Sequence, residues 1–549
     1  MPSKFIQIVA CGFIFLLTSA MPAAAADSLV KSIWIDGHGY DALLEPSRQV
    51  LRAADIADES LAGEHYRGHF PEDPDSWVRM SRLDSGWEGL AFVFGRMHTL
   101  GGSSQSEQTA SFSFTRMEAP QCGVEHVHSE SVITPESLTD TVMIQAVSAN
   151  YDSLCVDRVD GACLMMELEL AFDQQFQNRF PDDHQSRAGA ILNMVEGFYA
   201  DQFGIVFDTL SLTFMQNELF GSTTDAGLLL GDIRDKRFAG NIPFLESDQS
   251  IFHFVSGRDF NGSTAGLAYV GTVCNGSGYA TGITSAFSSN PTTAVIVAHE
   301  IGHSLGSNHD GDGISDNGCP VNGRIMSPHI SQNASEFSSC SFQQITDRIS
   351  SLPAVEQCFS FPADAGVSNV DGNPLEVVQG ASFQANFNVD YRQASGSPDG
   401  LTITGVIGEG EGQLQGVSID GSPCRLLDEV SFSCSGVTAR AGLPLSINAV
   451  AGPGPMFTLL QSVAVVSRIG DVKDIRPGND SLLTEITVAA SDTPVSDETD
   501  ESGTSATPRR TDSGTTASSG GSHGGGGAMH WLWLVLGMAG AGVRHRCPA

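Results

Sequence analysis

Residues 294–311 read AVIVAHEIGHSLGSNHDG and place three of the 15 histidines of the chain within eleven positions. The residues before the first histidine are mostly apolar and suit a buried helix. His299 and His303 are four positions apart, so a helix presents both imidazoles on one face. Gly306 allows the chain to leave the helix with a left-handed backbone, which turns His309 back towards the other two. The stretch therefore predicts three converging imidazoles.

The chemistry of this group is that of a catalytic metal site. Three neutral imidazoles bind zinc at about 2.0–2.1 Å and leave a fourth position open for water. Glu300 follows His299 directly and cannot share its direction towards the metal, but its carboxylate can reach the zinc-bound water as general base. In a chain with 15 His and 60 Gly, the full H-E-x-x-H-x-x-G-x-x-H pattern arises by chance on the order of once in ten thousand cases. The sequence predicts one catalytic zinc ion; a degenerate site kept for structure is the alternative.

Four motifs in this part of the chain resemble the metzincin zinc metalloproteases, and within them the adamalysin or reprolysin (ADAM-like) branch. Asp310 after the third histidine is the residue of that branch, and Met326 in RIMSPHI is the candidate for the Met-turn beneath the metal. FSSCS around Cys340 and GLAYVGTVC at residues 266–274 match two further motifs, the second being an upper edge strand. Ser304 stands where the branch usually has Asn. The resemblance implies an α/β catalytic domain with a mixed sheet and an active-site helix.

The same resemblance implies an endopeptidase that hydrolyses peptide bonds of extracellular proteins. Zinc would lower the pKa of its water and polarise the scissile carbonyl, and Glu300 would pass the proton to the leaving amine. A substrate would pair in extended form with the edge strand at residues 266–271. The competing class is a non-enzymatic surface adhesin or binding protein in which the metal site only stabilises the fold.

The composition of the chain limits the classes of molecule that it is expected to bind. The chain has 28 basic and 64 acidic residues and a formal net charge of −36, which repels phosphate backbones and anionic lipid. Nucleic acid is therefore not expected as a partner, whereas protein or peptide substrates are. A length of 549 residues with 41% hydrophobic content predicts two or three folded units.

Both ends of the chain carry targeting patterns. Residues 1–26 contain the apolar run FIQIVACGFIFLL followed by small residues, which predicts a secretory signal peptide. Residues 528–549 hold a sixteen-residue apolar stretch between a glycine run and the basic end RHR; as a helix it spans about 24 Å, less than the bilayer core of about 30 Å. This order resembles the GlyGly-CTERM sorting tail of Gram-negative bacteria, which a rhomboid-type sorting protease is thought to remove. It implies transient inner-membrane association and then an extracellular or cell-surface location; a plain C-terminal anchor is the alternative.

The rest of the chain divides by pattern. MELELAF (166–172) and IVFDTLSLTF (205–214) predict strands, with a helix between them. In SFQANFNVDY (382–391) apolar and polar residues alternate strictly, which predicts a strand of an all-β part. The chain is predicted to begin with a signal peptide (1–26) and a pro-domain (27–155), followed by the metzincin domain (156–361). A β-rich domain resembling an immunoglobulin-like sandwich (362–490), a Ser/Thr/Gly-rich linker (491–527) and the tail (528–549) complete it.

The chain has eleven cysteines, of which nine remain once Cys11 in the signal and Cys547 in the tail are set aside. Proximity favours pairing within Cys155–Cys163 and Cys424–Cys434, and the adamalysin pattern implies Cys319–Cys340 and Cys274–Cys358. Cys122 is then left over, and PQCGV around it resembles the cysteine switch of matrixin and ADAM pro-domains, in which a thiolate caps the zinc and keeps the enzyme latent. The alternative is an ordinary disulfide from Cys122 to Cys155 or Cys163.

DGDGISDNG at residues 310–318 spaces acidic side chains as calcium sites do, but it lacks the length and the final Glu of an EF-hand loop. A Gly-rich turn leading to the Met-turn is the favoured interpretation, with a calcium ion as the alternative. The β-rich domain has no catalytic cluster, and it is either a spacer or a substrate-binding exosite.

Overall fold

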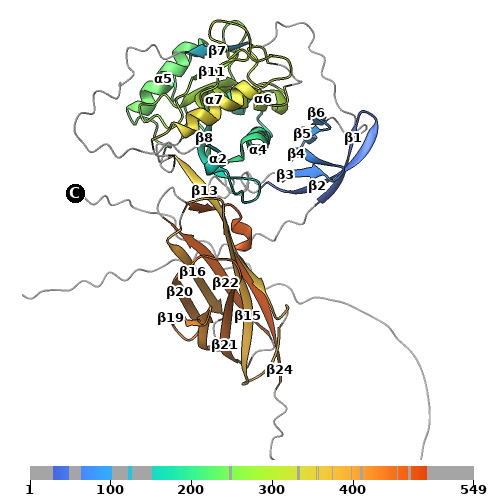
Figure 1. Cartoon of the computed structure of the whole chain (residues 1–549), viewed down its shortest axis with the longest axis vertical. Coiled ribbons are helices and arrows are strands. Elements are labelled where there is room, and N and C mark those ends of the chain that lie inside the picture. The colour runs from blue at the N-terminus through green and yellow to red at the C-terminus, as the bar shows by residue number, and fades with distance from the viewer. Residues whose placement is uncertain are drawn as a thin grey trace, which may run out of the picture. The chain divides into compact units, whose positions relative to one another are not determined.

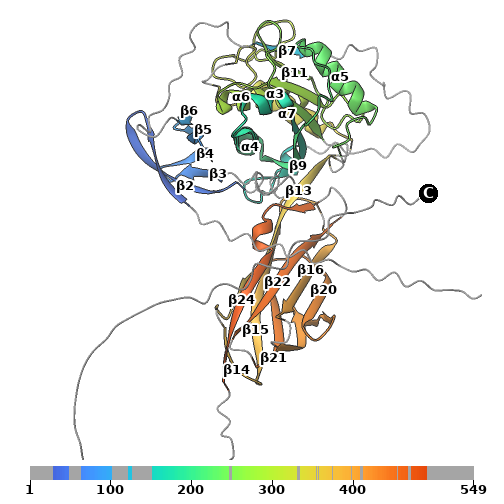
Figure 2. The same ribbon diagram turned by 180° about the vertical axis from the view of Figure 1, so that it is seen from behind.

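The computed structural model (Figures 1 and 2) describes residues 29–47, 64–101, the backbone of 121–125, 151–245, 250–330 and, with short gaps, 334–490. The predicted signal peptide, linker and tail lie outside the described residues. Within the described part of the chain, no helix is long and apolar enough to cross a membrane.

The first unit of structure is a six-stranded antiparallel sheet, called here the N-terminal sheet, in which each strand pairs with the next along the chain. A two-residue turn with positive φ at Asp36 and Gly37 joins the first two strands, as such tight hairpins require. The central strand β4 is buried on both faces: Val78 and Met80 join the core of this sheet, while Trp77 joins the core of the following domain. The strands are β1 (Leu29–Ile35), β2 (His38–Pro46), β3 (Glu64–Phe70), β4 (Asp73–Leu83), β5 (Gly86–Val93) and β6 (Arg96–Gly101).

The next domain is built on a mixed sheet in the order β9-β8-β10-β12-β11. Strands β9, β8, β10 and β12 pair in parallel with one another, and β11 pairs antiparallel with β12. Every residue of β10 and β12 is buried, as is usual for strands covered on both faces. The predicted mixed α/β sheet is confirmed, with strands β8 (Leu164–Phe172), β9 (Ile205–Phe214), β10 (Ile251–Ser256), β11 (Thr264–Tyr269) and β12 (Thr281–Ser285).

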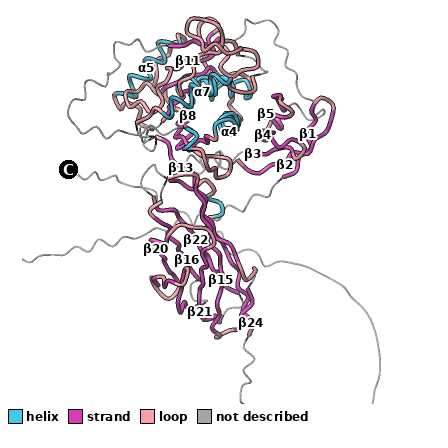
Figure 3. Tube along the Cα trace, in the orientation of Figure 1, coloured by secondary structure: helices cyan, strands magenta, loops and turns pink. Residues whose placement is uncertain are grey.

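The helices of this domain lie around the mixed sheet (Figure 3). Helix α4 (His184–Phe203) connects the parallel strands β8 and β9, and helix α6 (Asn290–Ser304) packs against α4, β11 and β12. All residues of α6 are buried, and the Ser289 side chain accepts the Thr292 N–H at its start, which satisfies one of the free donors of the first turn. The others are α5 (Ala226–Phe238) and α7 (Ser339–Ser350), with the short α2 (Tyr151–Leu154) and α3 (Gln174–Arg179). The sequence placed α4 and α6 correctly.

The C-terminal part is all β, as predicted. Strand β13 (Phe359–Asn369) runs through residue 362, where the predicted boundary lies, and pairs with β8 at one end and β15 along the rest. In β15 (Ser382–Gln393) the alternate residues Ala385, Phe387, Val389 and Tyr391 are buried. The immunoglobulin-like topology stays a prediction. One set of paired strands is β18-β17-β21-β15-β13 with β23, and the other is β14-β24-β22-β16-β20-β19.

The remaining strands of this part are short edge strands and long central strands. They are β14 (Leu375–Val378), β16 (Gly400–Ile407), β17 (Gly412–Ile419), β18 (Ser422–Pro423), β19 (Arg425–Leu426), β20 (Ser431–Val437), β21 (Leu443–Ala451), β22 (Met456–Val466), β23 (Val472–Asp474) and β24 (Ser481–Ala489).

Disulfides follow the predicted pairs. The structure contains Cys155–Cys163, Cys274–Cys358, Cys319–Cys340 and Cys424–Cys434. The bond from Cys274 ties the segment after β11 to the start of β13. Because Cys155 and Cys163 bind each other, the alternative in which Cys122 pairs with one of them is wrong.

Candidate active site

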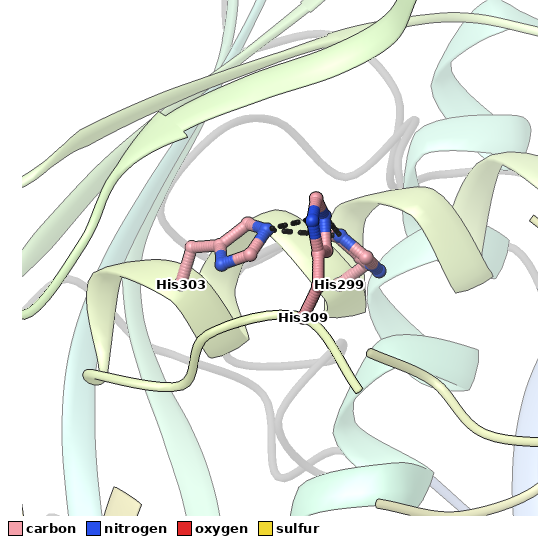
Figure 4. A group of neighbouring side chains, drawn as sticks. All are labelled: His299, His303 and His309. Atoms are coloured by element: carbon pink, nitrogen blue, oxygen red, sulfur yellow. Dashed lines mark hydrogen bonds between the residues drawn. The ribbon is translucent and has the colours of Figure 1, made fainter. Parts of the chain in front are cut away.

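The three histidines of the opening motif converge in the structure. His299 and His303 lie on α6, and His309 reaches the same point from the following loop (Figure 4). Their Nε2 atoms are 3.0 Å apart for His299 and His303, and 3.2 Å apart for each of the two pairs with His309. Among the described residues, these three histidines form a group that could hold a metal ion.

Hydrogen bonds on the far side of two rings fix their tautomers. Nδ1 of His299 lies 2.6 Å from the Ile325 carbonyl oxygen, and Nδ1 of His303 lies 2.7 Å from that of Ser307. A carbonyl oxygen only accepts, so both Nδ1 atoms donate and both Nε2 atoms present a lone pair towards the centre. Burial, and next the charge of His309, lowers the pKa of His299 to about 3, so this ring stays neutral.

This geometry fits a zinc ion. Tetrahedral ligands at about 2.0–2.1 Å from a common metal lie about 3.3 Å from one another, close to the spacings of the three Nε2 atoms. Buried lone pairs that face one another repel unless a cation lies between them, and imidazole is a preferred zinc ligand. His299, His303 and His309 would therefore hold the metal.

The turn after α6 depends on Gly306. Its φ of +109° is a conformation that side chains oppose, and a Cβ there would lie 2.9 Å from Cβ of Arg348. The N–H groups on either side of the turn bond back to the helix: Gly306 to the His303 carbonyl at 2.8 Å and Ser307 to that of Gly302 at 3.0 Å. The predicted role of Gly306 in returning the third histidine is consistent with this conformation.

Asp310 and Met326 join the loop of the third histidine to the segment that packs against α6. The Asp310 N–H donates to the Met326 carbonyl at 2.8 Å, and the buried Met326 side chain lies so close to Gly302 that a Cβ there would be 2.6 Å from its sulfur. The Met326 thioether therefore lies against α6 at Gly302, and its role as the Met-turn stays a prediction.

The sequence did not indicate what Asp310 does. Its Oδ1 accepts hydrogen bonds from Asn317 Nδ2 at 2.8 Å, Ser338 Oγ at 2.5 Å and Ser341 Oγ at 2.9 Å. Ser338 and Ser341 are the first and last serines of FSSCS, so this motif anchors the loop of the third histidine to the start of α7. The FSSCS motif was visible in the sequence, but only the fold shows that its serines bind Asp310.

The acidic loop at residues 310–318 folds as a turn. Asp316 Oδ2 accepts the Gly313 N–H at 2.8 Å, and the Gly318 N–H donates to the Gly311 carbonyl at 2.9 Å. The Asp316 carboxylate thus bonds to the backbone of its own loop, which fits the predicted Gly-rich turn. A calcium ion stays a prediction.

Glu300 lies between α6 and the edge strand. It is fully buried, and a Cβ on Gly266 of β11 would overlap its carboxylate. The absence of a side chain at residue 266 therefore gives the Glu300 carboxylate its position beside β11. This strand begins two residues before the predicted GLAYVGTVC motif and ends within it.

The outer edge of β11 is paired with β7 (Gln121–Glu125), the strand that contains Cys122. The two strands run parallel, with Gly266 opposite Cys122 and Leu267 opposite Gly123. The fold thus brings the backbone of Cys122 next to the glycine that touches Glu300, although nearly 150 residues separate Cys122 from that glycine in the sequence. The structure describes only the backbone of β7.

Comparisons with known proteins found a family model and relatives that are similar to parts of this chain. Residues 231–351 match the family model described as "Metallo-peptidase family M12B Reprolysin-like". The chain is 35% identical over 116 residues to the zinc metalloproteinase-disintegrin-like atragin of Naja atra, a match that covers 21% of this chain and 18% of that relative. A solved structure, metalloproteinase-II from Bacteroides fragilis, is similar at 10% identity and a TM-score of 0.36, over 59% of this chain and 92% of that one.

The family model and the curated relative show that this part of the chain is similar to reprolysin-like metallopeptidases of the metzincin family. The matched segment contains His299, Glu300, His303, His309 and Met326. The chain spans about 18% of the length of the curated relative that it matches.

Proposed function

We propose that this chain is a secreted zinc endopeptidase of the adamalysin or reprolysin type, made as a latent precursor, that cleaves extracellular proteins. The observation that carries the proposal is the joint position of three groups: the Nε2 atoms of His299, His303 and His309, the Glu300 carboxylate and the edge strand β11. Zinc bound by the histidines would supply Lewis acidity and polarise the scissile carbonyl.

The residues of the chain divide the remaining work. The backbone of β11 offers N–H and C=O groups along its outer edge, which can align an extended peptide in one register. Glu300 removes a proton from the attacking water as the new C–O bond forms, and it gives that proton to the amine nitrogen as the C–N bond breaks. Its buried position beside β11 holds it within reach of a peptide paired there.

Latency is the second part of the proposal. Strand β7 takes up the edge of β11 that a substrate would use, so substrate and β7 exclude each other. We propose that the thiolate of Cys122 caps the zinc, which is supported by the Gly266–Cys122 pairing and by the pairing of the eight described cysteines with one another. The same proposal includes Met326 as the methionine of the Met-turn and residues 27–155 as the pro-domain.

Location is the third part. The signal peptide pattern and the Gly-rich, apolar, basic tail support export from a Gram-negative bacterium, with a sorting protease removing residues 531–549 and a transient membrane stage before release. Peptide mass mapping of both ends of the mature protein from the native host tests this. An intact C-terminus on freely soluble protein would exclude the sorting tail.

The experiment that tests the activity is cleavage of casein by the purified mature protein, with and without 1,10-phenanthroline, and with the zinc content measured in parallel. We expect about one zinc per chain, cleavage without the chelator and none with it. Zinc bound at that level with no cleavage of casein, gelatin or a peptide library would favour the adhesin class.

A further inference from the structure

The N-terminal sheet and β7 contact different parts of the catalytic domain. Strand β7 lies along β11 at the site, whereas the sheet packs through β3, β4 and β5 on α4 and on the start of α6. The predicted pro-domain, residues 27–155, therefore contains two elements with separate contact surfaces.

The contact between the sheet and α4 has the close fit of a protein core. Gly189, Asn193 and Gly197 repeat every four residues and form one face of α4. A Cβ on Gly197 would lie 2.8 Å from Trp77 and 2.9 Å from Arg79, and one on Gly189 would overlap the ring of His65. Only residues without a side chain allow the backbone of α4 and the side chains of the sheet to approach this closely.

Polar groups at this contact are matched across it. Asn193 Nδ2 donates to the carbonyl oxygens of Tyr66 at 3.0 Å and Met80 at 3.2 Å. The Arg79 guanidinium lies 3.6 Å from the Glu196 carboxylate, and both side chains are almost fully buried. Separating the sheet would break this ion pair and both Asn193 hydrogen bonds.

Apolar groups add to the contact. Trp77, Leu83 and Leu90 of the sheet belong to the same core cluster as the residues of α4 and α6. The Trp77 ring meets the Phe198 ring edge to face, with centroids 5.5 Å apart. Loss of the sheet would expose this apolar surface to water.

The sheet also reaches the active-site helix. Glu88 of β5 accepts the Asn290 backbone N–H at 3.1 Å and the Asn290 side-chain amide at 3.0 Å. Asn290 is the first residue of α6, so a carboxylate from the sheet lies at the positive end of the helix that carries His299 and Glu300.

From these contacts we infer that the N-terminal sheet, Leu29–Gly101, stays bound to the catalytic domain after β7 has left, as a lasting non-covalent part of the enzyme that positions α6. Maturation then removes the block on β11 and keeps the sheet. The inference rests on the proposed function for the meaning of maturation, but the binding itself does not depend on activity.

The test uses the full chain with two recognition sequences for a site-specific protease, one between residues 101 and 121 and one between 125 and 151. After both cuts, native mass spectrometry and gel filtration are run in 0.1 M and 1 M NaCl. We expect one copy of the sheet fragment per catalytic chain at both salt concentrations, because buried ion pairs and apolar contacts are screened little, and we expect loss of the peptide that contains β7. Separation of the sheet fragment in either salt concentration overturns the inference.

A pair of tryptophan substitutions locates the binding surface. Trp77→Ala removes the ring that packs on Phe198, and we expect it to release the fragment after cutting. Trp34→Ala removes an exposed ring of β1, 48% exposed, and should leave the complex intact. If both variants retain the fragment, or if Trp34→Ala alone releases it, the α4 contact is not what binds the sheet.

Activity is measured separately on the same samples. A retained fragment with zinc but no cleavage would contradict the proposed endopeptidase and leave the inference standing. Cleavage that begins only when the sheet has dissociated would overturn the inference and leave the endopeptidase standing.

Discussion

Gly266 of β11 and Glu300 of α6 are packed so closely that a single added carbon on Gly266 would overlap the Glu300 carboxylate. The edge strand and the Glu300 carboxylate are thus fitted to each other, and in the proposed mechanism the strand sets how far this carboxylate lies from a peptide paired along it. The same glycine is opposite Cys122 of β7. Three elements of the proposed mechanism therefore meet at one residue that has no side chain.

Gly266→Ala should displace the Glu300 carboxylate while leaving the three histidines in place. Because misplacing a catalytic group by about 1 Å costs on the order of a hundredfold in rate, we expect kcat to fall by about that factor with zinc content unchanged. Gly276→Ala is the matched control, since nothing lies within 4 Å of a Cβ there. Equal kcat for both variants would show that the Gly266 contact does not position the base.

Glu300→Ala and His303→Ala should separate catalysis from metal binding. Removing the Glu300 carboxylate takes away a general base, worth roughly 10²–10⁴-fold, while all three ligands remain. We therefore expect zinc bound and cleavage lost for Glu300→Ala, and both lost for His303→Ala. Elemental analysis and a peptide assay on the same samples measure this. Substantial turnover by the Glu300 variant would mean that another group is the base.

Cys122→Ser should weaken latency before any proteolysis. A neutral hydroxyl is a far poorer zinc ligand than a thiolate, so the uncut variant should cleave a peptide faster than the uncut native precursor. X-ray absorption of the native precursor should show one zinc–sulfur distance of about 2.3 Å that disappears on maturation. A variant as latent as the native precursor would show that pairing of β7 with β11 blocks the site without help from the thiol.

Stability should fall in mild acid because of His65. Burial lowers its pKa from 6.5 to about 4, so between these values the unfolded chain binds a proton that the folded chain does not. The proton therefore costs no stability well above pH 6.5. The free energy of unfolding decreases as the pH falls from 6.5 towards 4, at up to about 1.4 kcal/mol per pH unit.

Urea unfolding at pH 7, 6 and 5 measures this dependence. His65→Gln should lower stability at pH 7, because the ring bonds to Ser81 Oγ at 2.7 Å, and should flatten the slope. His69→Gln, at an exposed position of the same strand, should leave the slope as it is. A slope that His65→Gln does not change would assign the acid sensitivity to other groups.

The sequence by itself determined the parts of this protein that depend on short chain separations. His299 and His303 face the same way because a helix repeats every 3.6 residues, and a glycine three residues later allows the turn that returns His309. Strand alternation in β15 and the helical spacing of α4 follow from the same local periodicities. The pairs Cys155–Cys163 and Cys424–Cys434 are close along the chain, so proximity alone indicated them.

Tertiary structure decided the contacts that join distant segments. Nothing around Gly266 indicates that its missing side chain makes room for Glu300, nothing in PQCGV indicates that it pairs with β11, and the serines of FSSCS acquire their role only when Asp310 lies beside them. The repeat of Gly189, Asn193 and Gly197 is equally typical of a helix that packs on any close neighbour. Such contacts depend on the summed packing of many side chains around a common core, and no local pattern records which surfaces that packing brings together.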